Sequence, residues 1–211
     1  VLDEVAVIGA GVAGVELAMA MAHAMKQHRS AITVTLIERG AGLTGVGTRA
    51  EARLRRALRS NGVTLLTGAN VRRITQDAVE LSEGQSVPSA FTVGTAGAFA
   101  HDWIGQTPLP QDDGFVRVDS HLRVEGTNTL FAVGDCAHMT HAPRPKAGVF
   151  AVRAAPVLHH NLRAALTGRR LRPFKPQGDY LKLISMGGKT AMAEKWGFPV
   201  SGPVLWRWKN R

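Results

Sequence analysis

The sequence EVAVIGAGVAG, residues 4–14, decides the fold of this chain. Its first six residues, 4–9, are β-branched and almost continuously apolar, which is typical of a buried parallel strand. Three glycines follow at positions 9, 11 and 14. Residues 12–26 are then rich in Ala, Leu and Met and lack proline, which predicts a helix. A strand, a G-x-G-x-x-G turn and a helix in this order predict a dinucleotide-binding unit.

Each glycine of the turn has its own physical role. Gly9 permits a tight turn, Gly11 lets the backbone approach a pyrophosphate, and Gly14 lets helix and strand pack closely. The N–H groups at the start of the helix and its positive dipole end favour the phosphate charge. The predicted pyrophosphate contacts are the consecutive residues Gly9, Ala10, Gly11, Val12, Ala13 and Gly14.

An acidic residue follows the second predicted strand, residues 32–37. Glu38 lies 24 residues after Gly14, where a carboxylate accepts hydrogen bonds from both hydroxyls of a ribose. The same carboxylate repels a 2′-phosphate, so the sequence favours NAD(H) over NADP(H). The neighbouring Arg39 is able to bind a 2′-phosphate and leaves NADP(H) as the alternative.

The elements after Glu38 continue a doubly wound α/β pattern. A helix over residues 48–60 and a strand over 63–66 complete strand–helix–strand–helix–strand, which predicts a Rossmann-like parallel sheet. Two short β-like runs, 71–75 and 78–81, predict a small antiparallel meander. Residues 90–93 predict a further parallel strand, closed by a glycine-containing loop that places Gly97 among the nucleotide contacts.

The second half of the sequence predicts a different region. Residues 101–114 resemble a surface crossover, and residues 130–135 form a predicted buried strand that ends in Asp135. A long helix is expected from about residue 146 to 167, because Pro145 suits a first helical turn. The remainder is expected to be irregular or short-stranded. We therefore expect a dinucleotide-binding domain over residues 1–115 and a second domain over residues 116–211.

Composition limits the class of protein. The chain has 211 residues, of which 45% are hydrophobic and 20% charged, as in soluble globular proteins. It has no apolar run long enough to cross a membrane. The single cysteine, Cys136, excludes an internal disulfide or a redox dithiol and suits a reducing cytosol. The histidines match no standard zinc spacing, so no metal site is expected.

Positive charge is concentrated in the second half. Residues 1–115 hold 10 Lys/Arg and 11 Asp/Glu, whereas residues 116–211 hold 16 and 5. The basic residues lack the interleaved aromatic residues of a single-strand binding platform, so nucleic acid is not the expected partner. A basic lipid- or nucleic-acid-binding domain in residues 140–211 is the least favoured hypothesis. The terminal WRWK sequence, residues 206–209, suits either a membrane interface or packing on the second domain.

Two motifs together resemble the pyridine nucleotide-disulfide oxidoreductase superfamily. They are the glycine turn extended by Glu16, and the LFAVGD sequence at residues 130–135. The PKAGVFAVR sequence at 145–153 and the C-terminal tail further resemble the NADH dehydrogenase-like flavoproteins. They are especially similar to the oxidoreductase module joined to selenide, water dikinase.

The resemblance implies a flavoprotein with two nucleotide sites. Asp135, with Gly134, would bind the ribityl chain of FAD, and Glu16 would face the nicotinamide of NAD(H). The start of the long helix would contact the isoalloxazine through Ala147, Gly148 and Val149, where its dipole stabilises negative charge on reduced flavin. Hydride would pass from NADH to the flavin and then to a quinone or another small electron acceptor. No side chain is expected to act as an obligate acid–base catalyst.

The resemblance also implies that part of the FAD site is missing from this chain. Family members begin with a separate FAD-binding glycine fingerprint, and this sequence has no second one. We therefore expect the NAD domain and the second half of an FAD domain, in a cytoplasmic protein that can associate with the inner face of a membrane. The alternative function is a nucleotide-binding or interaction module without turnover.

Overall fold

A computed structural model describes residues 3–28 and 32–210 of the chain. The chain divides into two compact units, one formed by Val1–Gly97 together with Leu181–Arg211, the other by Ala98–Tyr180. The first and last segments of the sequence therefore share one unit. We call these the first unit and the second unit.

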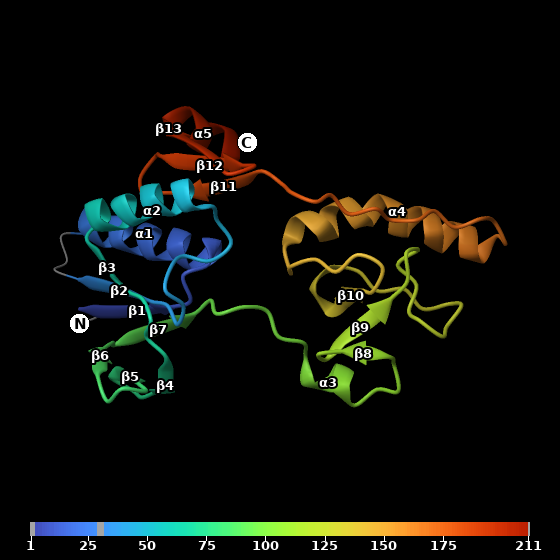
Figure 1. Cartoon of the computed structure of the whole chain (residues 1–211), viewed down its shortest axis with the longest axis horizontal. Coiled ribbons are helices and arrows are strands. Elements are labelled where there is room, and N and C mark those ends of the chain that lie inside the picture. The colour runs from blue at the N-terminus through green and yellow to red at the C-terminus, as the bar shows by residue number, and fades with distance from the viewer. Residues whose placement is uncertain (1–2, 29–31, 211) are drawn as a thin grey trace. The chain divides into compact units, whose positions relative to one another are not determined.

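The centre of the first unit is a four-stranded parallel sheet (Figure 1). Its strand order is β3-β2-β1-β7, which places the first strand of the chain inside the sheet with a neighbour on each side. This order and the parallel pairing confirm the α/β fold expected from the sequence. The four strands are β1 (Glu4–Ile8), β2 (Thr33–Ile37), β3 (Val63–Leu66) and β7 (Phe91–Gly94).

Different layers cover the two faces of this sheet. Helices α1 (Val12–Gln27) and α2 (Thr48–Asn61) cover one face, and the antiparallel meander covers the other. Side chains of β1 alternate accordingly: Val5 and Val7 pack in the core with the helices, and Ala6 packs in the core with the meander. The meander consists of β4 (Val71–Ile74), β5 (Ala78–Leu81) and β6 (Ser86–Pro88).

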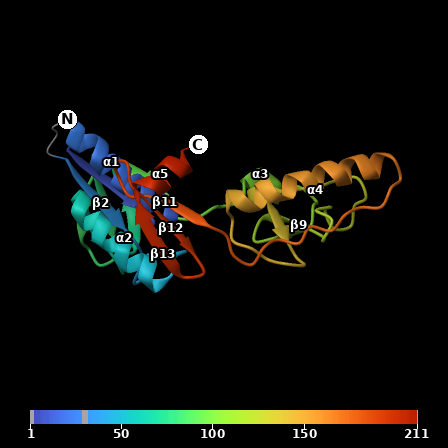
Figure 2. The same ribbon diagram turned by 90° about the horizontal axis from the view of Figure 1, so that it is seen from above.

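The C-terminal segment adds a further layer to the first unit. Its antiparallel strands lie over α1 and α2 on the side away from the parallel sheet, as Figure 2 also shows. Ile184 and Met192 are fully buried there in one core with Met19 of α1 and Leu54 of α2. The segment comprises β11 (Lys182–Ser185), β12 (Ala191–Lys195), β13 (Phe198–Gly202) and α5 (Pro203–Lys209).

This packing corrects the domain boundaries expected from the sequence. Residues 181–211 belong to the first unit, although they were expected in the second domain, and residues 98–115 belong to the second unit. The physical reason is that α1 is apolar on two sides, one against the sheet and one beneath β11 and β12. Burying that outer face requires the C-terminal strands. The terminal WRWK sequence accordingly lies in α5 of the first unit.

The second unit combines a small sheet with a long helix. Strand β9 (Phe115–Val118) pairs antiparallel with β8 (Gln111–Asp112) and parallel with β10 (Ala137–Met139). The helix α4 (Gly148–Leu166) packs Ala154 against Leu122 and Phe174. A short helix, α3 (Asp102–Gly105), lies within the expected crossover region.

The buried strand expected over residues 130–135 is not formed. Its start makes one isolated bridge, between Phe131 and Arg123, and its end is a 3-10 turn, Gly134–Cys136. Leu130 is 47% exposed. An apolar run becomes a buried strand only where neighbouring strands satisfy its backbone and cover its faces, and the described residues supply only the single bridge.

Candidate functional site

The glycine turn at residues 9–14 is held tightly by the first unit. Gly9 has φ +100° and donates its N–H to the carbonyl oxygen of Ile37 at 2.8 Å. A Cβ on Gly14 would lie 1.9 Å from the carbonyl oxygen of Gly9, so only glycine fits this first turn of α1. A Cβ on Gly9 would lie 2.9 Å from the backbone of Ala96. The structure thus provides direct packing reasons for glycine at positions 9 and 14.

Gly11 differs from the other two glycines. It is the N-cap of α1 with φ −70°, a conformation that any residue adopts, and a Cβ there would meet only Thr44 Oγ1 at 3.5 Å. The packing of this chain therefore does not require glycine at position 11. Room for an approaching phosphate is the remaining physical reason for it. Val12 and Ala13 follow in the first turn of α1, and no side chain caps that turn among the described residues.

Through its carboxylate, Glu38 joins the glycine turn to the loop that follows β2. Its side chain is buried at the carboxyl end of β2, where one carboxylate oxygen accepts the N–H of Ala10 at 2.8 Å and the other accepts the N–H of Gly40 at 2.7 Å. Each oxygen retains a lone pair for a further donor. The neighbouring Arg39 is exposed. The carboxylate therefore lies beside the glycine turn, where the sequence predicts a ribose.

Thr95 is a further residue of this site that sequence reasoning missed. It follows β7, and its hydroxyl lies 2.9 Å from the carbonyl oxygen of Gly9 and 3.0 Å from that of Ile8. This contact joins the loop after β7 to the glycine turn. Gly97, two residues later, has φ +105° and nothing within 4 Å of its Cβ position. A threonine directly after the glycine at a strand end was the available signal.

Glu16 has partners in the C-terminal segment. Its carboxylate accepts the backbone N–H of Ser185 at 2.9 Å and forms an ion pair with the ammonium of Lys209. The residue that the resemblance places near the nicotinamide is therefore tied to β11 and α5. Its role toward a nicotinamide stays a prediction.

The second unit brings together most of the residues expected at a flavin. Gly134, Asp135 and Ala147 line one pocket beside the start of α4. Gly134 has φ +77°, which allows the sharp turn that carries Asp135. Gly148 and Val149 belong to the first turn of α4 but do not line the pocket. An acidic side chain, a tight glycine turn and a helix N-terminus in one pocket fit part of a flavin nucleotide.

Lys146 is the second residue that sequence reasoning missed. Its ammonium donates to the carbonyl oxygen of Ala137 at 2.6 Å and lies 3.8 Å from the centroid of the Phe115 ring. Burial lowers the pKa of the Lys146 ammonium below its usual value, and the charge of Asp135 offsets part of that shift. A cation therefore lines the same pocket as Asp135. A lysine beside a proline at a helix start was the only signal in the sequence.

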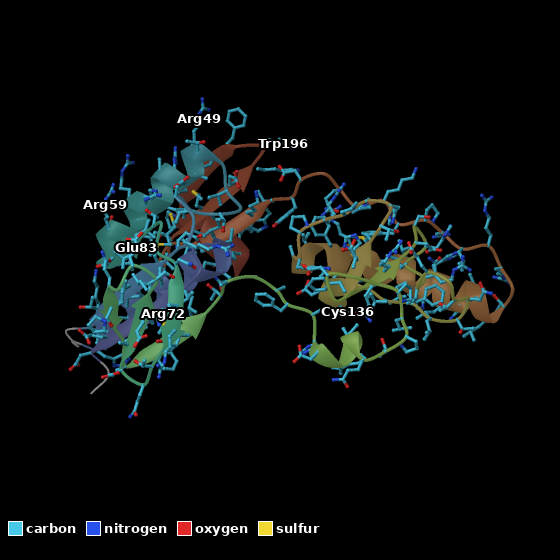
Figure 3. The ribbon with its side chains drawn as sticks, turned by 60° about the horizontal axis from the view of Figure 1, so that its bottom comes forward. Arg49, Arg59, Arg72, Glu83, Cys136 and Trp196 are labelled. Carbon is cyan, nitrogen blue, oxygen red and sulfur yellow. The ribbon has the colours of Figure 1, made fainter. Side chains whose placement is uncertain are left out.

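Other candidates have weaker support. Cys136 is exposed (Figure 3), and its thiol lies 3.3 Å from the carbonyl oxygen of Val133. Among residues 3–28 and 32–210, no group of three His, Cys, Asp or Glu side chains is placed to hold a metal ion. In the same described part of the chain, no helix is long and apolar enough to cross a membrane.

Comparison with known proteins connects these features to a family. Residues 2–155 match the model of the pyridine nucleotide-disulphide oxidoreductase family. An NADH dehydrogenase-like protein of Mycobacterium tuberculosis is 34% identical over 140 residues, which cover 63% of this chain and 35% of that protein. The demethylphylloquinone reductase NdbB of Synechocystis sp. is 28% identical over 212 residues, covering 95% of this chain and 50% of that protein.

Solved structures show the same fold at lower identity. NDH2 from Plasmodium falciparum in complex with NADH superposes with a TM-score of 0.81 at 14% identity, covering 99% of this chain and 61% of that one. A ferredoxin reductase from Rhodopseudomonas palustris gives a TM-score of 0.70 at 20% identity, covering 91% and 47%. The chain spans roughly a third to a half of the length of the curated relatives described here. With a family match over residues 2–155, the chain belongs to the pyridine nucleotide-disulphide oxidoreductase family.

Proposed function

We propose that this chain is the NAD(P)H-binding and C-terminal region of an FAD-dependent NAD(P)H oxidoreductase. The observation that carries the proposal is the buried Glu38 carboxylate, held against the glycine turn by the N–H groups of Ala10 and Gly40. A Rossmann-like turn with an acid at the end of the second strand is the arrangement that binds a dinucleotide. The pocket around Asp135 supports a second nucleotide.

The residues of the first unit would bind and orient the nicotinamide nucleotide. The N–H groups at the start of α1 would hold the pyrophosphate, with Gly11 leaving room for it. Glu38 would accept hydrogen bonds from the ribose hydroxyls through its remaining lone pairs. We place Gly97 in the loop that borders the nucleotide. Glu16, with its ion-pair partner Lys209, would face the nicotinamide end of the bound nucleotide.

The residues of the second unit would hold part of FAD. Asp135 would accept a hydrogen bond from the ribityl chain, and Gly134 and Ala147 would border it. The first turn of α4, with Gly148 and Val149, and the Lys146 ammonium would stabilise negative charge near the ring. When bound, FAD supplies the acceptor for hydride from the nicotinamide. The adenosine half of its site would come from residues outside this chain.

We propose NAD(H) as the preferred nicotinamide nucleotide. A 2′-phosphate would approach the Glu38 carboxylate, and the two negative charges would repel each other. Calorimetric titration of the chain with NADH and NADPH tests this choice, and we expect NADH to bind at least about tenfold more tightly. Glu38→Gln should reduce that preference, whereas Arg39→Ala should leave it. Equal or tighter binding of NADPH to the unaltered chain would overturn it.

Loss of binding would test the proposal more broadly. A folded sample that binds neither nucleotide would contradict the dinucleotide assignment and favour an interaction module without turnover. Tight one-to-one binding of FAD by this chain alone would contradict the proposal that the chain holds only part of the flavin site. In the full-length protein, anaerobic addition of NADH should bleach the absorbance of bound flavin. Persistence of the oxidised flavin spectrum would oppose hydride transfer.

The electron acceptor and membrane contact belong to the same proposal. The name of the Synechocystis relative says that it reduces demethylphylloquinone, which supports a quinone as acceptor. The C-terminal layer exposes Trp196, Phe198 and Trp208 by 72%, 66% and 55%, with Arg49 lying 5.7 Å from the Phe198 ring (Figure 3). Aromatic and cationic side chains together suit a membrane interface. Co-sedimentation with anionic vesicles tests this contact, and a Trp196→Ser/Phe198→Ser variant should weaken it.

A further inference from the structure

The second unit contains another concave site, which the proposed function does not use. Four of its six lining residues can carry positive charge, and none is acidic. The site shares no residue with the pocket around Asp135. We call it the basic pocket, and its lining residues are His121, His160, Arg170, Leu171, Arg172 and Pro173.

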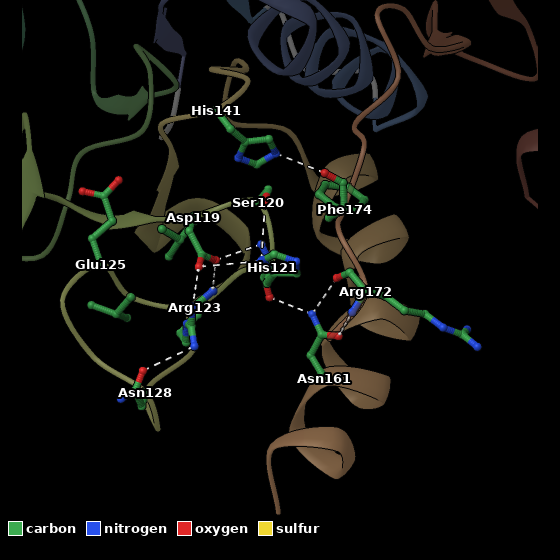
Figure 4. A network of polar contacts seen from close by, with 12 residues as sticks. Asp119, Ser120, His121, Arg123, Glu125, Asn128, His141, Asn161, Arg172 and Phe174 are labelled. Atoms are coloured by element: carbon green, nitrogen blue, oxygen red, sulfur yellow. Dashed lines mark hydrogen bonds and ion pairs between the residues drawn. The ribbon is translucent and has the colours of Figure 1, made fainter. Parts of the chain in front are cut away.

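One buried side chain fixes the walls of the basic pocket (Figure 4). Asn161 of α4 is fully buried, and its Nδ2 donates to the carbonyl oxygens of His121 at 2.7 Å and Arg172 at 2.9 Å. Its Oδ1 accepts the N–H of Arg172 at 2.7 Å. The turn at His121 and the strand-like segment at Arg172 are therefore both tied to the same helix. A fixed frame of this kind reduces the ordering needed when a ligand binds.

The carboxylate beside His121 is already occupied by other donors. Asp119 accepts the N–H groups of His121 at 2.8 Å and Arg123 at 3.0 Å, and its second oxygen pairs with the Arg123 guanidinium at 3.3 Å. The His121 imidazole lies 3.8 Å from that oxygen. Among the described residues, no carboxylate pairs with the guanidinium of Arg170 or Arg172. These two charges are therefore available to an anion.

The segment that supplies five of the six lining residues has one sign of charge. Residues 136–178 contain eight Lys/Arg and four His but no Asp or Glu. His160 Nε2 lies 3.4 Å from the carbonyl oxygen of Arg170. Because a carbonyl oxygen only accepts, Nε2 must carry the proton in this contact, which orients the ring. Such a region raises the local concentration of anions.

We propose that the basic pocket binds a phosphate group, carried by a free phosphate monoester or by the headgroup of an anionic lipid. Guanidinium groups match phosphate oxygens with paired donors, and imidazole N–H groups add further hydrogen-bond donors. The site is concave and is lined by two arginines and two histidines. Its lining has no Phe, Tyr or Trp ring on which a base could stack, which argues against single-stranded nucleic acid.

Nuclear magnetic resonance of the histidine rings in the whole chain tests this site. We titrate inorganic phosphate and follow His121 and His160, which are identified with His121→Gln and His160→Gln. Saturable shifts are expected at both rings but not at His23, which lies in the first unit. The Arg170→Ser/Arg172→Ser variant should weaken phosphate binding about tenfold, because it removes two charge-assisted donors from a partly solvated site.

A second double variant distinguishes phosphate binding at a specific site from attraction by the net positive charge of the chain. Arg56→Ser/Arg59→Ser removes the same charge from α2 and should leave phosphate affinity unchanged. Vesicles containing phosphatidic acid, compared with phosphatidylcholine vesicles, then distinguish the source. Loss of vesicle binding in the Arg170→Ser/Arg172→Ser variant identifies a lipid headgroup, whereas shifts with free phosphate alone identify a soluble monoester. Equal weakening by both double variants, or no saturable shift with any probe, would overturn the proposal.

Discussion

The glycine turn of the first unit and the Asp135 pocket of the second unit differ in how far this chain completes them. Hydrogen bonds surround the turn: the Gly9 N–H donates to the Ile37 carbonyl oxygen, the Ala10 N–H donates to the Glu38 carboxylate, and the Thr95 hydroxyl donates to the Gly9 carbonyl oxygen. The strands that carry the turn have neighbours inside the chain. The turn is therefore a preorganised site before any ligand arrives.

The Asp135 pocket lies at the end of an apolar run that has not become a strand. Leu130 is 47% exposed, and among the described residues the run forms one β-bridge, between Phe131 and Arg123, while Ala132 and Val133 pack against neighbouring core residues. The pocket itself carries groups suited to an anionic ligand, including Lys146. The side chains suited to a nucleotide can thus lie together in a pocket although the strand leading to that pocket has not formed. The difference teaches that chain-internal neighbours, and not the motif alone, turn an apolar run into a sheet strand.

The largest expected effect comes from adding one methyl group to the turn. In Gly14→Ala the new Cβ would lie 1.9 Å from the Gly9 carbonyl oxygen, so α1 must shift and stability should fall by about 4 kcal/mol. Urea unfolding in a Trp103→Phe background measures it, since the three remaining tryptophans all lie in the first unit. Gly94→Ala is the control, because Gly94 also lies in the first unit and a Cβ there would meet nothing within 4 Å. Equal stability of both variants would contradict the tight packing of the turn.

The next effect compares a buried and an exposed apolar side chain. Ile184→Ala should cost about 3 kcal/mol, because Ile184 is fully buried against α1 and leaves a cavity there. Leu130→Ala should change stability by less than about 0.5 kcal/mol, since that side chain is partly in solvent. Urea unfolding gives both values. Ile184→Ala is measured in the Trp103→Phe background, and Leu130→Ala is measured with Trp103 retained. If Ile184→Ala left the free energy of unfolding unchanged, that result would contradict the packing of the C-terminal strands in the core of the first unit.

The sequence predicted the first unit well because its information is local. The apolar run of residues 4–9 and the glycine turn of residues 9–14 each specify a neighbouring element directly. Of the predicted site residues, Glu38 lies beside the turn, and Gly134, Asp135 and Ala147 share one pocket. Their ligands stay proposals.

The sequence could not reveal contacts between distant segments. Glu16 and Ser185 are 169 residues apart, and no pattern in the sequence of β11 indicates that it packs against α1. The expected strand at 130–135 was wrong because its apolar pattern alone did not determine pairing: among residues 3–28 and 32–210, the run forms only the isolated bridge between Phe131 and Arg123. Thr95 and Lys146 were missed because a single threonine or lysine carries no periodic signal.

A smaller expected effect separates ligand space from packing at the turn itself. Gly11→Ala should leave the free energy of unfolding unchanged, because the new Cβ meets only Thr44 Oγ1 at 3.5 Å. The same methyl group would occupy the space proposed for the pyrophosphate and should weaken NADH binding about tenfold or more. Calorimetry and urea unfolding on one sample give both numbers. Unchanged NADH affinity in a stable variant would exclude Gly11 from the nucleotide site.

The smallest expected effect concerns pH and the second unit. Burial raises the pKa of the Asp119 carboxyl. The hydrogen bonds from the N–H groups of Arg123 and His121, together with the Arg123 charge, lower this pKa by more than burial raises it. The net pKa therefore lies below the ordinary value of 3.8. A carboxyl with a depressed folded-state pKa stabilises the fold above its unfolded pKa, and this contribution is lost as pH falls through the folded value. Asp119→Asn should therefore destabilise the second unit at pH 7 by about 1 kcal/mol.

The deficit of Asp119→Asn should shrink as the pH falls below about 4, because the carboxyl of the unaltered protein then takes up its proton. Unfolding followed by Trp103 fluorescence, in a background with Trp196, Trp206 and Trp208 replaced by Phe, measures this dependence in the second unit alone. Asp113→Asn is the matched control, since Asp113 is an exposed acidic residue in a turn of the second unit, on which Trp103 reports. A deficit that stays constant from pH 7 to pH 3 would show that Asp119 acts through hydrogen-bond geometry and not through its charge. In that case the frame of the basic pocket would depend on Asn161 more than on the ion pair.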